Sequence, residues 1–465
     1  MDIEKAFDHV PRSLLLKKLV TLGIGKCMLF ALKQIYGFSV CVMKFQQELS
    51  SSFSMKRGVR QGAASSVILF NVFIDGLFQH LQSNCSLENI LNDIHALVHA
   101  DDTIILSTDR EKFIQKCNET IKFFSDHKLT LNVGKSSYLI INFSENFHSR
   151  SSLILSNGVM KYKQNFKYLG VMISDSGSLK HDVTSYITQK RSNVSVKFSN
   201  FCKVHCNAPL SAKLKVLDCC VSSSIIYAAE TWGNVTKPAD LSYKSGLRAA
   251  LSVRQNTNDE IVFIESGKYP LHCRIKKQQL KFWLYILKYT SDNPNSSLNK
   301  ILSKANELGI SYIRYYKKLH ELFIDPVNCE YQLRLIQEEK WKRKINAAYI
   351  TDLDSKLGTY FRINPSLTRF VDHTGTENER ILITRFRTGS HSLNIELGRF
   401  SNVPRGNRLC ICKGNVQTIQ HIFTECILTN HLIDREYQSL AEIFEDPELP
   451  RLILSIVKVL KIPTR

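Results

Sequence analysis

The 465-residue chain contains 43% hydrophobic residues, enough to bury a core in two or three domains, which excludes a disordered tail. Its 62 Lys and Arg against 42 Asp and Glu give a formal charge of +20. That charge favours a polyanionic partner through counterion release, although charge alone leaves membrane surfaces and acidic proteins open. The 13 scattered Cys and the absence of a secretion signal indicate a reducing intracellular location, with cytoplasm and nucleus both compatible.

Residues 1–175 mix short apolar runs with amphipathic stretches, which predicts an α+β domain. Two helices are expected, at 65–81 and 111–126, because apolar residues recur there at helical spacing. Their apolar faces consist of Phe70, Ile74, Leu77 and Leu81 in the first helix and Ile114, Cys117, Ile121 and Phe124 in the second. We see no apolar stretch of about 20 residues and therefore expect a soluble chain without a membrane partner.

Between these helices, the apolar runs 95–100 and 103–107 flank Asp101 and Asp102, a pattern typical of a strand, a tight turn and a second strand. Adjacent aspartates in a turn are ordinarily structural. Here the apolar flanks suggest the tip of a buried hairpin, where two charges are costly unless a cation neutralises them. Asp2, beside the apolar Ile3, offers a second side for such a site. Three carboxylates from two segments suit a two-metal phosphoryl transfer centre.

The remaining chain is expected to be organised in four parts. The sequence of residues 176–345 predicts a helical and basic region, with linkers at 233–240 and 291–297. Residues 346–400 are interpreted as a linker region, 401–435 as a small cysteine-rich module, and 436–465 as a C-terminal helix centred on 449–460. No internal repeat is evident.

Four segments in the same order resemble the palm of reverse transcriptases. They are Asp2-Ile-Glu-Lys-Ala-Phe-Asp-His-Val, Arg57-Gly-Val-Arg-Gln-Gly-Ala-Ala-Ser, His99-Ala-Asp-Asp and Phe166-Lys-Tyr-Leu-Gly. The residues in these four motifs are most similar to those of non-LTR (LINE-type) retrotransposons of the jockey-like kind. The resemblance implies a right-hand polymerase with a palm at 1–175 and a helical thumb and connector at 176–345.

The resemblance also implies the roles of the acidic residues. Asp2 and Asp101 would bind two Mg²⁺ ions, with the backbone carbonyl of Ile3 as a further ligand and Asp102 as a peripheral carboxylate. Lys135 matches a family lysine that protonates the leaving pyrophosphate, although a surface lysine is the alternative.

Further residues match the positions that contact nucleotide, template and primer. Phe7 matches an aromatic gate that selects deoxynucleotides, with a core phenylalanine as the equal alternative. Gln61 and Gly62 would lie under the template base and incoming nucleotide, and Arg57 and Arg60 would contact phosphates or form a solvated basic turn. Three further residues would help to hold the 3′ end of the primer, namely Tyr168, Leu169 and Gly170.

The sequence departs from the family pattern at several places. Ala64 and Val67 stand where the family usually has Pro, and His99 stands where it has an aromatic residue. The family's fingers precede the first aspartate, which is residue 2 here, so we expect a chain truncated at its N-terminus that lacks most of the fingers and the upstream endonuclease. No ribonuclease H carboxylate set is found at 240–370.

Near the C-terminus, Cys410, Cys412, His421 and Cys426 form a ligand set that suits tetrahedral zinc. Ordinary buried thiols with a polar histidine are the alternative. The preceding Arg385-Phe-Arg-Thr-Gly-Ser-His-Ser-Leu-Asn and the earlier Ile225-Ile-Tyr-Ala-Ala-Glu-Thr-Trp-Gly resemble the same non-LTR proteins, in which a zinc knuckle follows the thumb.

The sequence therefore predicts an RNA-directed DNA polymerase that uses Mg²⁺, deoxynucleoside triphosphates, an RNA template and a DNA primer or target. The alternative is a catalytically inactive retroelement relic that binds nucleic acid. A protein-interaction module built on the helical middle is a third hypothesis. The oligomeric state is not predicted.

Overall fold

The computed structural model describes residues 1–85, 95–141, 151–323, 325–352, 355–367 and 375–463. The chain divides into two compact units, Met1–Asp182 and Val183–Arg465. The first unit combines helices with short sheets and the second is helical, which confirms an α+β chain.

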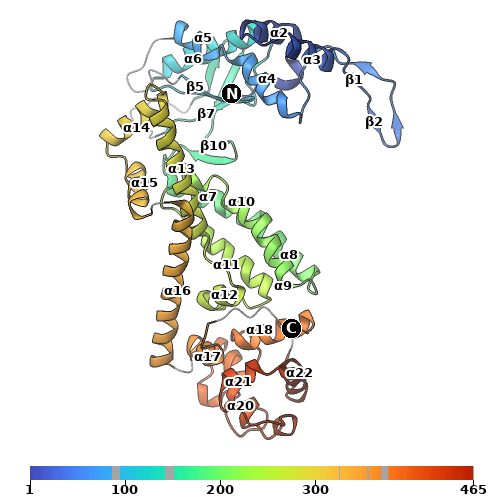
Figure 1. Cartoon of the computed structure of the whole chain (residues 1–465), viewed down its shortest axis with the longest axis vertical. Coiled ribbons are helices and arrows are strands. Elements are labelled where there is room, and N and C mark those ends of the chain that lie inside the picture. The colour runs from blue at the N-terminus through green and yellow to red at the C-terminus, as the bar shows by residue number, and fades with distance from the viewer. Residues whose placement is uncertain (86–94, 142–150, 324, 353–354, 368–374, 464–465) are drawn as a thin grey trace. The chain divides into compact units, whose positions relative to one another are not determined.

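Unit 1 contains α1 (Ala6–His9), α2 (Arg12–Thr21), α3 (Lys26–Gly37), β1 (Val40–Cys41), β2 (Lys44–Phe45), β3 (Glu48–Leu49), β4 (Phe53–Ser54), α4 (Ala64–Ile74), α5 (Leu77–Asn84), β5 (Ala96–His99), β6 (Asp102–Ile105), α6 (Arg110–Asp126), β7 (Ser137–Tyr138), β8 (Leu153–Leu155), β9 (Gly158–Tyr162), β10 (Asn165–Tyr168) and β11 (Val171–Ser174). β5–β6 and β10–β11 are antiparallel hairpins, and β9 pairs parallel with β7 and antiparallel with β8. β1–β4 and β2–β3 form a narrow antiparallel ribbon that extends from α3 (Figure 1).

The core of unit 1 lies between its helices and the β5–β6 hairpin. The helix predicted at 65–81 is broken at Asp75 and Gly76 into α4 and α5, but its four apolar residues are all buried. α6 begins where the Asp109 side chain accepts a hydrogen bond from the Lys112 amide at 2.9 Å, which confirms the second predicted helix.

One stretch of the described residues, Ala64–Asn84, is long and apolar enough to cross a membrane by length and composition, with a mean hydropathy of 1.3. The core helix of a soluble protein meets the same criteria, so this stretch does not contradict the expectation of a chain without a membrane partner. The burial of Phe70, Leu77 and Leu81 in the unit 1 core supplies a reason for its apolar composition.

Helix α7 (Leu179–Lys190) spans the boundary between the units. Unit 2 continues with η1 (Arg191–Ser195), α8 (Val196–Val204), α9 (Leu210–Val216), η2 (Leu217–Ser222), α10 (Ser223–Ile225), η3 (Ala229–Thr231), α11 (Lys237–Leu251), α12 (Asp259–Ser266), α13 (Leu271–Asp292), α14 (Ser297–Glu307), α15 (Ser311–Leu322), α16 (Pro326–Thr351), α17 (Lys356–Ile363), α18 (Glu377–Arg387), α19 (Asn394–Phe400), η4 (Arg405–Asn407), α20 (Ile419–Thr424), η5 (Asn430–Leu432), α21 (Leu440–Glu445) and α22 (Leu449–Val459). The predicted helical middle and the helix at 449–460 are confirmed.

The segment 346–400 is not the linker region that the sequence suggested. Apart from 353–354 and 368–374, which lie outside the described residues, it is largely helical and contains α17, α18 and α19. Leu382, Ile383 and Phe386 on α18 belong to the same hydrophobic cluster as Cys410 and Cys426. The sequence analysis did not detect the apolar face of α18, because most residues of this helix are polar or charged.

A buried ion pair joins three helices of unit 2. Arg387 Nε on α18 donates to Glu265 on α12 at 2.8 Å, and the Tyr360 hydroxyl on α17 donates to the same carboxylate at 2.9 Å. Both charged side chains are almost fully buried. The carboxylate thus neutralises a cation that water does not reach.

Glu265→Gln is expected to lower the free energy of unfolding by about 3–5 kcal/mol, because Arg387 is left buried without a counter-charge. Glu339→Gln is the control, since its exposed pair with Arg343 on α16 contributes less than about 1 kcal/mol. Urea unfolding followed by circular dichroism measures both. Equal losses in the two variants would contradict the role given to the buried pair.

Candidate active site and candidate metal centre

Asp2 lies in an extended segment between the β5–β6 hairpin and residues 130–132. The Met1 nitrogen donates to the Thr103 carbonyl at 2.6 Å, and the Thr103 amide donates back at 3.4 Å. On the other side, the Asn132 amide donates to the Asp2 carbonyl at 2.8 Å. Backbone pairing on both edges therefore fixes the position of Asp2.

The same pairing brings Asp2 to the tip of the hairpin. Because Met1 faces Thr103 in an antiparallel arrangement, the next residues along, Asp2 and Asp102, face each other. Burial lowers the pKa of the Met1 amino group, while the nearby Asp102 and Asp2 charges act to raise it. Asp101 occupies the turn after Ala100, whose φ of 54° marks the change of direction.

The hairpin tip is exposed to solvent rather than buried. Asp101 and Asp102 are exposed and Asp2 is half-buried. The argument that burial makes these charges costly without a cation is therefore wrong, because water solvates them. Among the described residues, the three aspartates do not form a closed group of metal ligands, in contrast to the C-terminal cluster. An open carboxylate site that water and substrate phosphates complete is the arrangement that Mg²⁺ commonly uses.

Ser136 is a positioning residue that the sequence did not reveal. Its hydroxyl accepts a hydrogen bond from the Asp2 amide at 3.0 Å and donates to the Asn132 carbonyl at 2.9 Å. Lys135, directly before it, is exposed in the turn that follows Asn132. The only signal in the sequence was the position of Ser136 next to Lys135.

Phe7 lies at the edge of the hydrophobic core of unit 1. Its ring lies 5.1 Å from the ring of Phe70, so one side belongs to the core, while the residue as a whole is half-buried. Its carbonyl accepts a hydrogen bond from the Val59 amide at 2.8 Å. The loop that carries Gln61 is thereby tied to the Asp2 segment, and Gln61 Nε2 donates to Asp8 at 3.3 Å.

The loop 57–62 presents its basic side chains outward. Arg57 and Arg60 are exposed, and no described residue forms a hydrogen bond or an ion pair with either guanidinium group. Gly62 has a φ of 81° and open space where a side chain would begin, as close approach of a ligand to its backbone requires. Arg12 was missed by the sequence analysis. Its guanidinium donates to the carbonyls of Gly58, Tyr36 and Met55, which anchors the loop.

Gly58→Ala is expected to lower the free energy of unfolding by about 2–3 kcal/mol and to displace the loop. Gly58 has a φ of 88°, and an added Cβ would lie 2.7 Å from the Asp8 carbonyl oxygen. Thermal unfolding measures the change. Gly134→Ala is the control, because its Cβ would meet no atom closer than 3.5 Å, and it should cost less than about 0.5 kcal/mol. If the Gly58 variant is as stable as this control, the expected clash between the added Cβ and the Asp8 carbonyl does not occur.

The segment Phe166-Lys-Tyr-Leu-Gly lies in an antiparallel hairpin formed by β10 and β11. Tyr168 pairs with Val171 across a two-residue turn, in which Leu169 and Gly170 both have positive φ, at 46° and 84°. Burial raises the pKa of Tyr168, and the charge of Asp102 raises it further. Asp102 is therefore the aspartate whose charge Tyr168 senses.

The C-terminal cluster is compact. The donor atoms of Cys410, Cys412, His421 and Cys426 all lie within 4.8 Å of one another. The Cys410 and Cys426 sulfurs are 3.8 Å apart, and Cys412 Sγ lies 3.2 Å from His421 Nε2. Zn–S bonds of about 2.3 Å in a tetrahedron separate two sulfurs by about 3.8 Å. The donor set and its spacing fit zinc.

Local structure accounts for this arrangement. A turn after Cys410 places Cys412, and α20 carries His421 with its first turn capped by Thr418. His421 Nδ1 lies 3.4 Å from Glu425, which leaves Nε2 to face the sulfurs. Burial raises the pKa of Cys410 to about 11. Burial alone would raise the pKa of Cys412 too, but hydrogen bonds from the Gly414 amide and from His421 bring it down to about 6.

Comparison with known proteins agrees with the geometry of unit 1. The reverse transcriptase (RNA-dependent DNA polymerase) family matches residues 1–173. Residues 1–173 are a reverse transcriptase domain. This domain contains all four of the sequence motifs, and its family implies a palm-type polymerase fold. The finer assignment to the jockey-like kind stays a prediction.

Three relatives illustrate the similarity. The chain is 26% identical over 193 residues to the Retrovirus-related Pol polyprotein from type-1 retrotransposable element R2 of Popillia japonica, which covers 39% of the chain and 27% of that protein. It is 26% identical over 190 residues to the Retrovirus-related Pol polyprotein from type-2 retrotransposable element R2DM of Drosophila melanogaster. This match covers 39% of the chain and 18% of that protein. The putative 115 kDa protein of element R1DM from the same fly is 19% identical over 290 residues, covering 61% of the chain and 28% of that protein.

The reverse transcriptase domain is thus only part of what these relatives contain. The chain spans about a quarter or less of the length of the two R2 relatives. The cysteine and histidine cluster at 410–426 lies outside the range that the reverse transcriptase family matches.

Proposed function

We propose that the protein is an RNA-directed DNA polymerase of a non-LTR retrotransposon. The observation that carries the proposal is the backbone pairing that sets Asp2 opposite the Asp101–Asp102 hairpin tip inside the reverse transcriptase domain. In the reaction, a primer 3′-hydroxyl attacks the α-phosphorus of a deoxynucleoside triphosphate, a new P–O bond forms and pyrophosphate leaves. RNA is the proposed template and DNA the proposed primer or target.

Asp2 and Asp101 would hold two Mg²⁺ ions, with the Ile3 carbonyl as a further ligand and Asp102 at the edge of the site. Bound there, the ions supply Lewis acidity that stabilises charge on the attacking and leaving oxygens. Solvent exposure of the hairpin tip supports this assignment, since the nucleotide and primer must reach the carboxylates. Ser136 would keep Asp2 in register through its hydrogen bond to the Asp2 amide.

Other residues of the domain would position the substrates. Phe7 would exclude a ribose 2′-hydroxyl with the side of its ring that faces away from Phe70, and Gln61 and Gly62 would contact the template base and nucleotide. Arg57 and Arg60, exposed on the same loop, would bind phosphates. Lys135 would donate a proton to the leaving pyrophosphate. Tyr168, Leu169 and Gly170 would hold the primer end. The raised pKa of Tyr168, caused first by burial and then by the charge of Asp102, supports this location.

Primer extension by the full chain tests the proposal. With a DNA primer annealed to RNA, deoxynucleoside triphosphates and Mg²⁺, the primer should lengthen, and chelation of Mg²⁺ by EDTA should stop it. Salt-sensitive binding to the same template and primer, without extension at any Mg²⁺ concentration, would instead identify an inactive nucleic-acid-binding protein. Intracellular location and the helical thumb at 176–345 belong to the same proposal.

We further propose that Cys410, Cys412, His421 and Cys426 bind one Zn²⁺ as a closed structural site. Three of the four side chains are buried, and Glu425 and Gln417 contact ligand atoms from outside the cluster. Such outer contacts orient metal ligands. Zinc would displace the thiol proton of Cys410, so its affinity should fall as the pH is lowered.

A further inference from the structure

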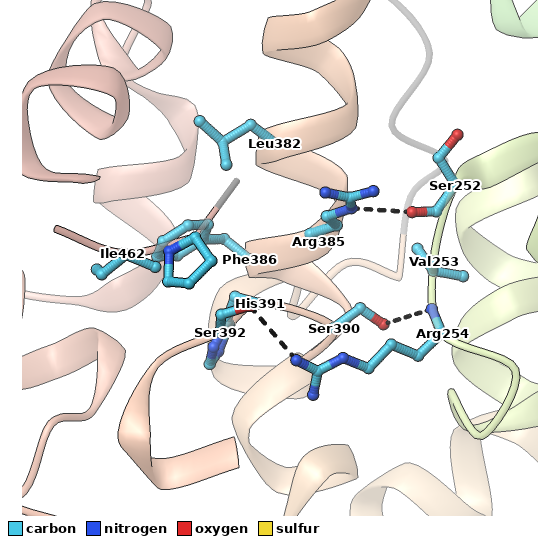
Figure 2. A pocket seen from close by; sticks show the side chains of 11 residues that line it. Ser252, Val253, Arg254, Leu382, Arg385, Phe386, Ser390, His391, Ser392 and Ile462 are labelled. Atoms are coloured by element: carbon cyan, nitrogen blue, oxygen red, sulfur yellow. Dashed lines mark hydrogen bonds between the residues drawn. The ribbon is translucent and has the colours of Figure 1, made fainter. Parts of the chain in front are cut away.

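A cavity of about 160 Å³ in unit 2 lies between α18 and the loop after α11 (Figure 2). Two arginines and three serines supply most of its polar lining. The polar residues are Ser252, Arg254, Arg385, Ser390, His391 and Ser392. No Asp or Glu lines it among the residues that the structure describes.

Arg254 reaches across this cavity. Its guanidinium carbon lies 5.0 Å from the centre of the Phe400 ring, and Nη2 donates to Ser392 Oγ at 3.5 Å (Figure 2). Its backbone amide donates to Ser390 Oγ at 3.3 Å. The Nη1 group is buried and has no hydrogen-bond partner among the described residues. A buried donor without an acceptor is unfavourable, so this nitrogen is prepared for a ligand oxygen.

Arg385 places a second positive charge at the same cavity. Its Nε donates to the Ser252 carbonyl at 2.9 Å, which orients the guanidinium toward the loop after α11. Burial lowers the pKa of Arg385, and the charge of Arg254 lowers it further. Both arginines line the same cavity, so one anion inside it could contact both side chains.

Among the residues that the structure describes, Glu265 and Glu396 of unit 2 are each paired with a cation that does not line the cavity. Glu265 binds Arg387, and Glu396 binds Lys356 at 3.2 Å and also Arg399. His391 contributes no charge, because burial, and then Arg254, lower its pKa to about 3. The described residues that line the cavity therefore carry net positive charge near neutral pH.

We propose that this cavity binds a phosphate group through Arg254 and Arg385. The flat fork of a guanidinium matches the oxygens of phosphate, and the serine hydroxyls can donate further hydrogen bonds. The phosphate can belong to the backbone of an RNA or DNA strand or be free inorganic phosphate. The inference goes beyond the polymerase reaction and does not depend on activity at the aspartates.

The test compares Arg254→Gln with Arg343→Gln in the full chain. Both variants remove one positive charge, but Arg343 is exposed on α16 and does not line the cavity. Fluorescence anisotropy measures binding of a labelled oligo(dT), and calorimetry measures binding of inorganic phosphate. For a backbone phosphate, Arg254→Gln should weaken oligo(dT) binding about tenfold and reduce the slope of log affinity against log salt by about 0.7. The control variant, Arg343→Gln, should change the affinity for oligo(dT) by less than about twofold.

The outcomes separate the two sources of phosphate. Loss of inorganic phosphate binding with unchanged oligo(dT) binding would assign the cavity to free phosphate. Equal behaviour of the Arg254 and Arg343 variants with both probes would overturn the proposal. If Arg254→Gln does not fold by circular dichroism, Ser392→Ala replaces it, because it removes the hydroxyl that accepts from Arg254 Nη2. It should weaken binding about threefold, and an unchanged affinity would count against the site.

Discussion

Asp101→Asn is expected to reduce primer extension by about a thousandfold. The amide keeps the size of the side chain but removes the negative charge that would hold the Mg²⁺ ions. Because Asp101 is exposed in a turn, the loss of its charge should leave the free energy of unfolding unchanged within about 0.5 kcal/mol. Single-turnover extension of a labelled primer on RNA, with circular dichroism of the same preparation, measures both quantities.

The control for this variant is Asp126→Asn, an identical chemical change at an exposed position at the end of α6. It should extend the primer at the rate of the unaltered chain. An Asp101 variant that matches this control would refute the assignment of the carboxylate. If both bind template and primer equally while only Asp101→Asn fails to extend, the loss lies in the chemical step rather than in binding.

Cys426→Ser is expected to remove the bound zinc and to destabilise the cysteine-rich module by about 5 kcal/mol or more. Zinc contributes on the order of 10 kcal/mol in small domains that fold around it, and here part of the stability comes from the surrounding hydrophobic cluster. Atomic absorption should give one zinc per chain before the substitution and none after it. Limited proteolysis should then cut within 401–435.

Cys206→Ser is the matched control, because this exposed cysteine lies outside the cluster. It should retain one zinc and the proteolysis pattern of the unaltered chain. A strong chelator added to the unaltered chain should reproduce the Cys426 result. A chain without zinc that resists proteolysis as well as the control would show that the thiols are ordinary core residues.

The sequence predicted those parts of unit 1 whose local patterns agree with their final surroundings. The β5–β6 hairpin and α6 both combine an apolar pattern with a suitable turn or capping residue. The break between α4 and α5 was not predicted, because the apolar face continues through Asp75 and Gly76 as if the helix were unbroken. Similarly, the polar sequence of α18 concealed a helix that buries Phe386.

The candidate sites show a second limit of sequence reasoning. The residue types at Asp2, at Asp101 and in the C-terminal group of three cysteines and one histidine are informative, because each suits the chemistry of a metal ligand. Contacts between distant segments are not encoded in such patterns: Ser136 beside Asp2, Arg12 under Gly58 and the pair Glu265–Arg387 each depend on the folded chain. The exposure of the hairpin tip was mispredicted for the same reason, since apolar flanks do not reveal what covers a turn.

The segment that carries Asp2 is held by main-chain hydrogen bonds to residues about a hundred positions away on one side and 130 on the other. Neither contact can form during local folding, so the three aspartates come together only when unit 1 closes as a whole. The amide hydrogens of Thr103 and Asn132 should consequently exchange with solvent together, at the rate at which this part of the domain opens. Conditions that loosen the helices far from the aspartates would dismantle the site without altering any of its side chains.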